Sequence, residues 1–126
     1  MRTFILSLIL FLILVGVSTW SQIYLSHESK HLMAKIDELE SCIESDNWKE
    51  ALKKIADMED ELEKREYAFS AILNHNETMQ IYQIIAEATQ FINHEHKPLA
   101  MAKVHELKHR FRFIYLNNEL TIKNVF

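Results

Sequence analysis

The sequence predicts an all-α protein in which an N-terminal transmembrane helix is followed by two α-helical hairpins, arranged as a four-helix bundle or as a tetratricopeptide-like pair. Three observations lead to this prediction. An uncharged, apolar stretch opens the chain, and the roughly one hundred residues behind it contain one Pro and no Gly. Apolar residues in that second part recur every three or four positions. Its two halves also align without a gap at an offset of 49 residues.

The first element is the stretch from Thr3 to Ser26, in which no residue carries a charge. A helix of this length extends about 36 Å, and the hydrocarbon core of a bilayer is about 30 Å thick. The sequence therefore predicts a transmembrane anchor over residues 1–26 that contacts the lipid bilayer through residues 4–25.

A cleaved signal peptide is the alternative for this stretch, with a small-residue cleavage site at Gly16-Val17-Ser18. We favour an uncleaved anchor because the apolar character continues past that site through Trp20 and Tyr24. Aromatic residues at the end of an apolar run are typical of a membrane span with an interfacial belt.

The orientation of the anchor is indicated by the charges around it. Arg2 and the terminal amine favour a cytoplasmic N-terminus, although Lys30 and Lys35 follow the span closely and reduce the asymmetry of positive charge. We expect a single-pass protein of the cell membrane whose soluble domain is extracytoplasmic.

The first hairpin is predicted over residues 27–74, with a turn at Ser45-Asp46-Asn47. We expect Asn47 to cap the second helix in a capping box with Glu50, and this helix to extend to Leu73. The apolar stripes of the two helices are Leu32, Met33, Ile36, Leu39 and Ile43, then Ala51, Leu52, Ile55, Met58 and Leu62.

The second hairpin is predicted over residues 75–118, after a break at Asn74-His75-Asn76. Its first helix ends near Asn93, and Pro98 suits the first turn of its second helix. We expect that helix to end near Asn117-Asn118, which leaves residues 119–126 as an unassigned tail. The apolar stripes are Ile81, Tyr82, Ile85, Ala88 and Ile92, then Ala100, Met101, Val104, Leu107, Phe111 and Ile114.

The two hairpins are related by the offset of 49 residues. Matched apolar positions include Leu32 with Ile81, Ile36 with Ile85, Ile43 with Ile92, Ala51 with Ala100, Ile55 with Val104, Met58 with Leu107, and Leu62 with Phe111. One gapless offset that fits both helices and the turn between them predicts a structural repeat, whose units are too small to bury their apolar faces alone.

Charge and composition exclude several classes of function. Without Arg2, the chain has 13 basic and 18 acidic residues, a balance that argues against nucleic acid and against electrostatic adhesion to anionic lipid. The single cysteine, Cys42, excludes an internal disulfide. Without Gly the domain has no phosphate-binding loop and no nucleophile elbow, so we expect neither an enzyme nor a cofactor.

Seven histidines raise the question of a metal site. His94 and His96 lie at the predicted turn, and His105 and His109 are spaced i, i+4, so these four are weak candidates for a metal site. Glu106 and His109 also have the Glu-x-x-His spacing of di-iron bundles. Helix geometry places them roughly 130 to 170° from the centre of the apolar stripe, facing away from the core where such a site is built.

Trp48 and His75 are the candidates for contact with a partner. An aromatic residue at the start of a helix either locks a hairpin or binds a partner, and we expect Trp48 to lock the hairpin. His75 lies beside the break between the hairpins. We expect it to hydrogen-bond a helix end rather than to act in catalysis.

Four segments, in order, resemble a known family. They are the Arg-led anchor FILSLILFLILVGVSTW, LESCIESDNWKEA, ILNHNE at the central break and ELTIKNVF at the C-terminal end. They are similar to a family of short, membrane-anchored bacterial proteins classed as a domain of unknown function, found mainly in spore-forming Gram-positive bacteria. The resemblance implies the architecture and the membrane attachment, and it implies no activity. The family pattern has Asp where this chain has Asn74, so we do not expect an acid–histidine pair with His75.

Two functional hypotheses follow from the sequence. The first is a membrane-tethered protein-interaction module, in which the hairpins present a groove or the exposed edge of the fourth helix to another protein of the cell envelope. The second is a ligand or metal sensor that uses the His-rich region of the third and fourth helices. We favour the interaction module, with no nucleic acid among its partners.

Overall fold

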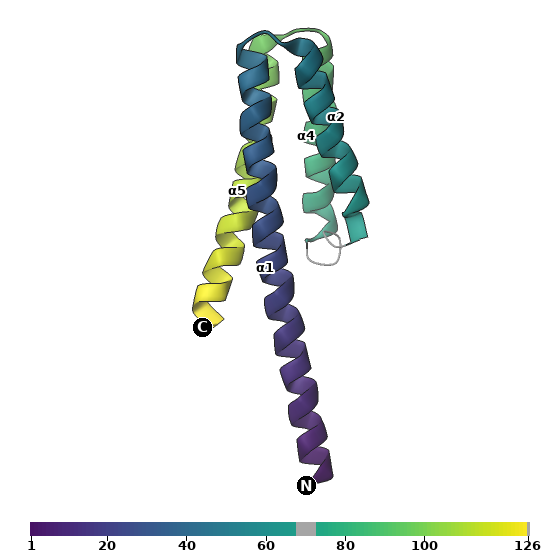
Figure 1. Ribbon diagram of the computed structural model, residues 1–126, viewed down its shortest axis with the longest axis vertical. Coiled ribbons are helices and arrows are strands. Elements are labelled where there is room, and N and C mark those ends of the chain that lie inside the picture. Colours follow the sequence, from purple (N-terminus) through teal and green to yellow (C-terminus); the bar gives the residue numbers. More distant parts are fainter. Residues whose placement is uncertain (68–72, 126) are drawn as a thin grey trace.

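The computed structural model describes residues 1–67 and 73–125 of the chain (Figure 1). These residues form four α-helices and no strand, which confirms the prediction of an all-α protein. The helices are α1 (Arg2–Glu44), α2 (Trp48–Lys64), α4 (His75–Asn93) and α5 (Lys97–Val125).

The helices pack as an antiparallel ring. Helix α1 packs on α2, α2 on α4, α4 on α5, and α5 packs back along α1 in the most extensive of these contacts. An open stack of hairpins leaves its first and last helices apart, whereas here they close the ring. The structure is therefore a four-helix bundle rather than a tetratricopeptide-like pair.

The bundle core uses the positions that the repeat predicts. At the offset of 49 residues, eight buried apolar residues of α1 and α2 meet buried residues of α4 and α5. The pairs are Leu32 and Ile81, Ile36 and Ile85, Leu39 and Ala88, Ile43 and Ile92, Ala51 and Ala100, Ile55 and Val104, Met58 and Leu107, and Leu62 and Phe111. The repeat is thus a property of the packing as well as of the sequence.

The two tight turns repeat at the same offset. Asp46 and Glu95 adopt positive φ angles of 59° and 54°. The amide that follows each of them donates to the carbonyl five residues back, Asn47 to Cys42 and His96 to Phe91, both at 2.9 Å. This is the Schellman arrangement that ends many helices, so α1 and α4 end in the same way. Both turns lie at one end of the bundle (Figure 1).

Helix α1 is one uninterrupted helix of 43 residues that contains both the predicted anchor and the first helix of the bundle. From Met1 to Ser18 every residue is exposed, and the first buried residue is Leu25. The most apolar 18-residue window has a mean hydropathy of 2.3, and none of it is buried inside the protein. The helix is long and apolar enough to cross a bilayer.

Two predicted helix ends differ in the structure. Helix α2 ends at Lys64, not at Leu73, and residues 68–72 of that prediction lie outside the described residues. Helix α5 continues through Asn117-Asn118 to Val125 and includes most of the predicted tail. Asn within a helix costs only about 0.7 kcal/mol relative to Ala, so two adjacent Asn residues need not end it.

The predicted capping box at the start of α2 is also wrong. Asn47 occupies the N-cap position, but its side chain makes no capping hydrogen bond. The side-chain cap is found instead at α4, where the Oδ1 atom of Asn74 accepts from the amides of Asn76 at 2.7 Å and Glu77 at 3.4 Å. Asp and Asn serve equally well in this position, which gives a physical reason for either residue there.

Candidate functional site

Helix α5 carries apolar side chains on two opposite faces. One face is buried in the bundle through Val104, Leu107 and Phe111. The opposite face presents Phe113, Leu116 and Leu120, whose side chains are 60%, 45% and 57% exposed. These three are spaced three and four residues apart, so they form a second stripe on the helix. We call this stripe the outer face of α5.

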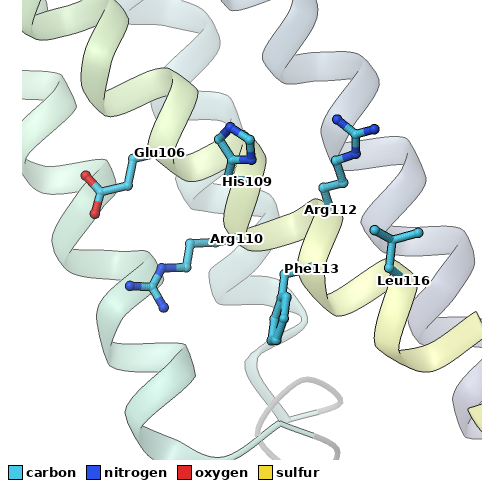
Figure 2. Close-up of a pocket in the computed structure, with 6 residues that line it drawn as sticks. All are labelled: Glu106, His109, Arg110, Arg112, Phe113 and Leu116. Atoms are coloured by element: carbon cyan, nitrogen blue, oxygen red, sulfur yellow. The ribbon is translucent and has the colours of Figure 1, made fainter. Parts of the chain in front are cut away.

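A groove lies over the first two residues of this outer face, Phe113 and Leu116. Its volume is about 580 Å³. It is lined by Glu106, His109, Arg110, Arg112, Phe113 and Leu116 (Figure 2). All six residues come from α5, so the groove is an open surface feature. Enclosed pockets that bury most of a small ligand draw their walls from several elements, and an open groove suits a macromolecular partner better.

The charges around the groove are mainly positive. Figure 2 shows Arg110 and Arg112 pointing to different sides of α5, with Phe113 between them. Among the described lining residues, Glu106 is acidic, and its Oε2 atom lies 3.2 Å from the Nζ atom of Lys103. An apolar centre with a basic rim is complementary to a partner surface that combines apolar and acidic side chains.

Lys103 also joins α5 to α4. Its Nζ atom lies 2.6 Å from Oε2 of Glu87. The hydrogen bonds to Glu87 and then to Glu106 raise the pKa of Lys103, and the hydrogen bond from Lys103 lowers the pKa of Glu87. Lys103 therefore stays protonated and neutralises acidic charge at the edge of the groove, which leaves the arginines to determine its sign.

The structure places the two turn histidines at helix ends. The Nδ1 atom of His94 is 2.9 Å from the backbone oxygen of Gln90, within the last turn of α4. The Nδ1 atom of His96 accepts from the amide of Leu99 at 3.3 Å and caps the start of α5. Both side chains thus contact backbone groups at helix ends, and that of His96 satisfies an amide that the start of a helix leaves without a partner.

The other two candidate ligands lie together on α5. The rings of His105 and His109 meet edge to face with their centres 4.8 Å apart, and Nδ1 of His105 is 3.7 Å from Oε1 of Glu40. Within residues 1–67 and 73–125, no group of three or more His, Cys, Asp or Glu side chains is placed to hold a metal ion. The structure therefore does not bring the four histidines into one site.

The two predicted partner contacts lie at opposite ends of the bundle. Trp48 begins α2 beside the turns and is half-buried against the core, as expected of a residue that locks the hairpin. His75 is exposed at the start of α4, where Asn74 performs the capping expected of the histidine. The sequence pointed to the exposed edge of the fourth helix as a contact surface, but not to the residues of the outer face of α5. The spacing of Phe113, Leu116 and Leu120 contained the signal, but the predicted helix ended before Leu120.

Comparison with known proteins identifies the family. The model of the family described as "Domain of unknown function (DUF4363)" matches residues 19–125. This match covers most of the chain, and the chain belongs to the DUF4363 family. Searches of the curated proteins and of the solved structures each gave no significant match.

Proposed function

We propose that this DUF4363 protein is a membrane-anchored, non-enzymatic interaction module that presents the groove of α5 to a protein partner in the cell envelope. The observation that carries the proposal is the apolar part of the groove, where Phe113 and Leu116 are 60% and 45% exposed on the face of α5 that points away from the bundle. A helix that is already packed on one side has no need of apolar residues on the other side unless something covers them.

The continuity of α1 supports this role. The helix passes from the exposed apolar span into the bundle without Gly or Pro after Gly16, so the chain has no built-in hinge at the membrane. A rigid connection holds the bundle, and with it the groove, at a fixed height and angle above the membrane. Such placement favours encounters with a partner held in the same membrane or at its surface.

The chemistry of the groove defines the partner. Phe113 and Leu116 offer an apolar centre, and Arg110 and Arg112 offer planar cations suited to carboxylates. The partner we propose is therefore a protein segment with apolar anchors flanked by Asp or Glu. Aromatic and Arg residues carry much of the binding energy in protein interfaces, which makes Phe113 and Arg110 the residues to test.

Site-specific photo-crosslinking in cells tests this proposal. A photoreactive residue at Phe113 should form a defined adduct with one protein, whereas the same residue at Leu99 should not. Leu99 is a matched control because it is also an exposed apolar residue of α5, near the other end of the helix. Arg110→Glu should abolish the adduct at position 113. Equal labelling at both positions, or an adduct unaffected by Arg110→Glu, would contradict the proposal.

A ligand or metal sensor is supported less well. His105 and His109 are the one histidine pair that the described residues bring within contact, and Glu40 lies beside them. A two-histidine site on an exposed helix leaves most of a zinc coordination shell to water. We therefore retain the interaction module as the proposed function, and the sensor is tested below by zinc addition.

A further inference from the structure

The end of α5 lies level with the end of the apolar span. The contacts between α1 and α5 fix their antiparallel register, because Nδ1 of His105 lies 3.7 Å from Glu40 and Nζ of Lys108 lies 2.5 Å from Asp37. Continued along both helices, this register places Leu120 level with Leu25. Figure 1 shows the same relation, with the C-terminal end of α5 beside the middle of α1.

The end of α2 and the start of α4 lie at this same end of the bundle (Figure 1). Arg65 follows the last residue of α2 and its Nη1 atom pairs with Glu28 of α1. Tyr67, two residues further on, is 95% exposed. Residues that are distant in the sequence are thus brought to the level at which α1 leaves the apolar span.

The side chains at this level are those that favour a membrane interface. Trp20 and Tyr24 stack on each other on α1, with ring centres 6.0 Å apart. Tyr67 and Leu120 are exposed, and Lys123 lies in the last turn of α5. Trp and Tyr concentrate in the headgroup region of bilayers, and Lys extends its ammonium group from apolar surroundings towards water.

We propose that this end of the bundle rests in the headgroup layer of the same bilayer that holds α1. The occupant of the surface formed by Tyr67 and Leu120 is therefore lipid, not protein. The inference rests on the proposed membrane anchor and adds an orientation to it. The bundle stands upright on the membrane, and its two turns, at Asp46 and Glu95, lie about 30 Å from the surface, given 1.5 Å of rise per residue along α1.

The acidic groups at this end differ in exposure. Glu28 of α1 is 8% exposed and paired with Arg65, so it presents little net charge to lipid, whereas Glu66, beside Tyr67, is exposed. Aromatic and aliphatic side chains enter a zwitterionic interface without any need for anionic lipid. Contact of this end of the bundle with the headgroup layer is therefore compatible with an acidic domain, and we expect it in phosphatidylcholine alone.

Tryptophan fluorescence of the full chain in phosphatidylcholine vesicles tests the orientation. Trp48→Phe leaves Trp20 as the depth reference. In a second background, Trp20→Phe with Trp48→Phe, a single reporter is placed by Leu120→Trp or by the matched control Leu99→Trp. Both positions are exposed leucines of α5, at its two ends. Lipids brominated near the headgroup end of the acyl chain serve as quenchers, and circular dichroism checks that each variant is folded.

The upright orientation predicts that the Trp at position 120 is quenched by these lipids, as Trp20 is, and emits at shorter wavelength than the Trp at position 99, which is not quenched. Quenching of Trp20 without quenching at position 120 would contradict the upright orientation of the bundle and leave the membrane anchor supported. Quenching at both 120 and 99 would show a bundle lying flat and would also contradict that orientation. Failure to quench Trp20 would overturn the membrane anchor, and with it both proposals.

Discussion

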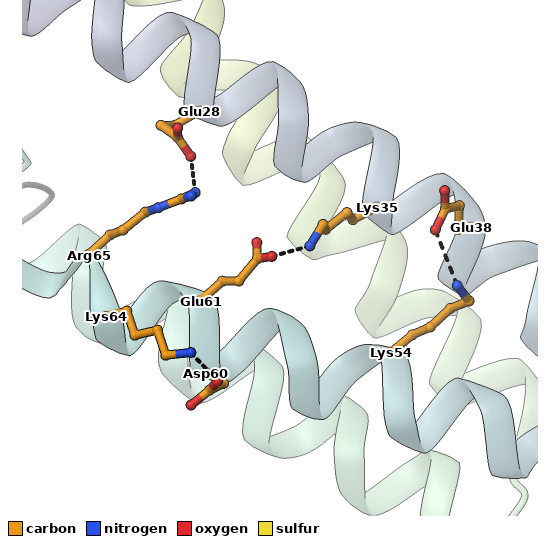
Figure 3. Close-up of polar contacts among 8 residues, drawn as sticks. All are labelled: Glu28, Lys35, Glu38, Lys54, Asp60, Glu61, Lys64 and Arg65. Carbon is orange, nitrogen blue, oxygen red and sulfur yellow. Dashed lines mark hydrogen bonds and ion pairs between the residues drawn. The ribbon is translucent and has the colours of Figure 1, made fainter.

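The two hairpins share their core positions and their turns, but the ion pairs and contacts that join the two helices of each hairpin differ. Along the first hairpin, α1 and α2 are joined by ion pairs of Glu28 with Arg65, Lys35 with Glu61, and Glu38 with Lys54 at 3.2 Å (Figure 3). The hydrogen bond from Lys35 lowers the pKa of Glu61. In the second hairpin α4 and α5 are in more extensive contact, and Lys103 bridges to Glu87 at their edge.

The difference continues at the ends of the second helices. At the offset of 49 residues, the last residue of α2, Lys64, corresponds to Phe113 of α5. The part of α5 that follows has no counterpart within α2, and it carries Leu116, Leu120 and the C-terminal turn. The outer face of α5 therefore begins where the correspondence between the two helices ends. The repeated positions thus form the bundle core, and the extension of one copy completes the apolar part of the candidate contact surface.

The largest expected effect is a loss of stability on overpacking the core positions that the two hairpins share. Ala51 and Ala100 are fully buried at matching positions. Overpacking a core costs about 1 to 3 kcal/mol, so Ala51→Phe and Ala100→Phe should each lower the free energy of unfolding by a similar amount in that range. Chemical denaturation in mild detergent, followed by circular dichroism, measures the effect. Tolerance of Phe at one position alone would break the equivalence of the hairpins.

The sequence predicted the shared features and missed those that differ. The core stripes and the turn at Ser45-Asp46-Asn47 followed from local spacing, and the repeat from the offset of 49 residues. The extension of α5 through Asn117-Asn118 was not predicted because Asn is a weak helix former, yet within a helix it costs only about 0.7 kcal/mol relative to Ala. The outer face was missed for the same reason, since its stripe is complete only when Leu120 belongs to the helix.

The next effect tests the charged edge of the first hairpin. Glu28 is almost buried, and Arg65→Ala would leave its carboxylate without this partner. Because a charged group left unsatisfied costs about 1 to 3 kcal/mol, and the Arg65 side chain is itself partly exposed, we expect a loss of about 1 to 2 kcal/mol in the free energy of unfolding. Denaturation in detergent at neutral pH provides the measurement.

Lys64→Ala is the control for that substitution. Lys64 neighbours Arg65 and pairs with Asp60 at 3.0 Å, but both side chains are largely exposed and belong to one helix. Such pairs contribute about 0.3 to 0.5 kcal/mol. If both variants changed the free energy of unfolding equally, the Glu28–Arg65 pair would contribute no more to stability than an exposed ion pair.

A smaller effect, an increase in the free energy of unfolding, is expected to differ between the two turns. Glu95 adopts a positive φ of 54°, which costs an ordinary residue energy that Gly avoids. Glu95→Gly should therefore raise the free energy of unfolding by about 0.5 to 1 kcal/mol. Asp46→Gly should gain less, because Asp46 also pairs with Lys97 at 3.3 Å. Equilibrium unfolding of both variants checks this order, and a larger gain at position 46 would contradict the contribution of that ion pair.

The smallest expected effect concerns the histidines of α5, which have no equivalents in α2. His105→Ala and His109→Ala should each change the free energy of unfolding by no more than about 0.5 kcal/mol, because both side chains project from an exposed face. Melting curves of the full chain in detergent, with and without zinc, provide the measurement. A ligand that binds the folded state alone raises its stability in proportion to the logarithm of ligand concentration over dissociation constant. We expect no such rise, because two histidines and Glu40 at 3.7 Å form no closed shell for the ion. A zinc-dependent rise in melting temperature that disappears in both variants would favour the sensor, and it would mean that the second hairpin differs from the first by a metal site as well as by a contact surface.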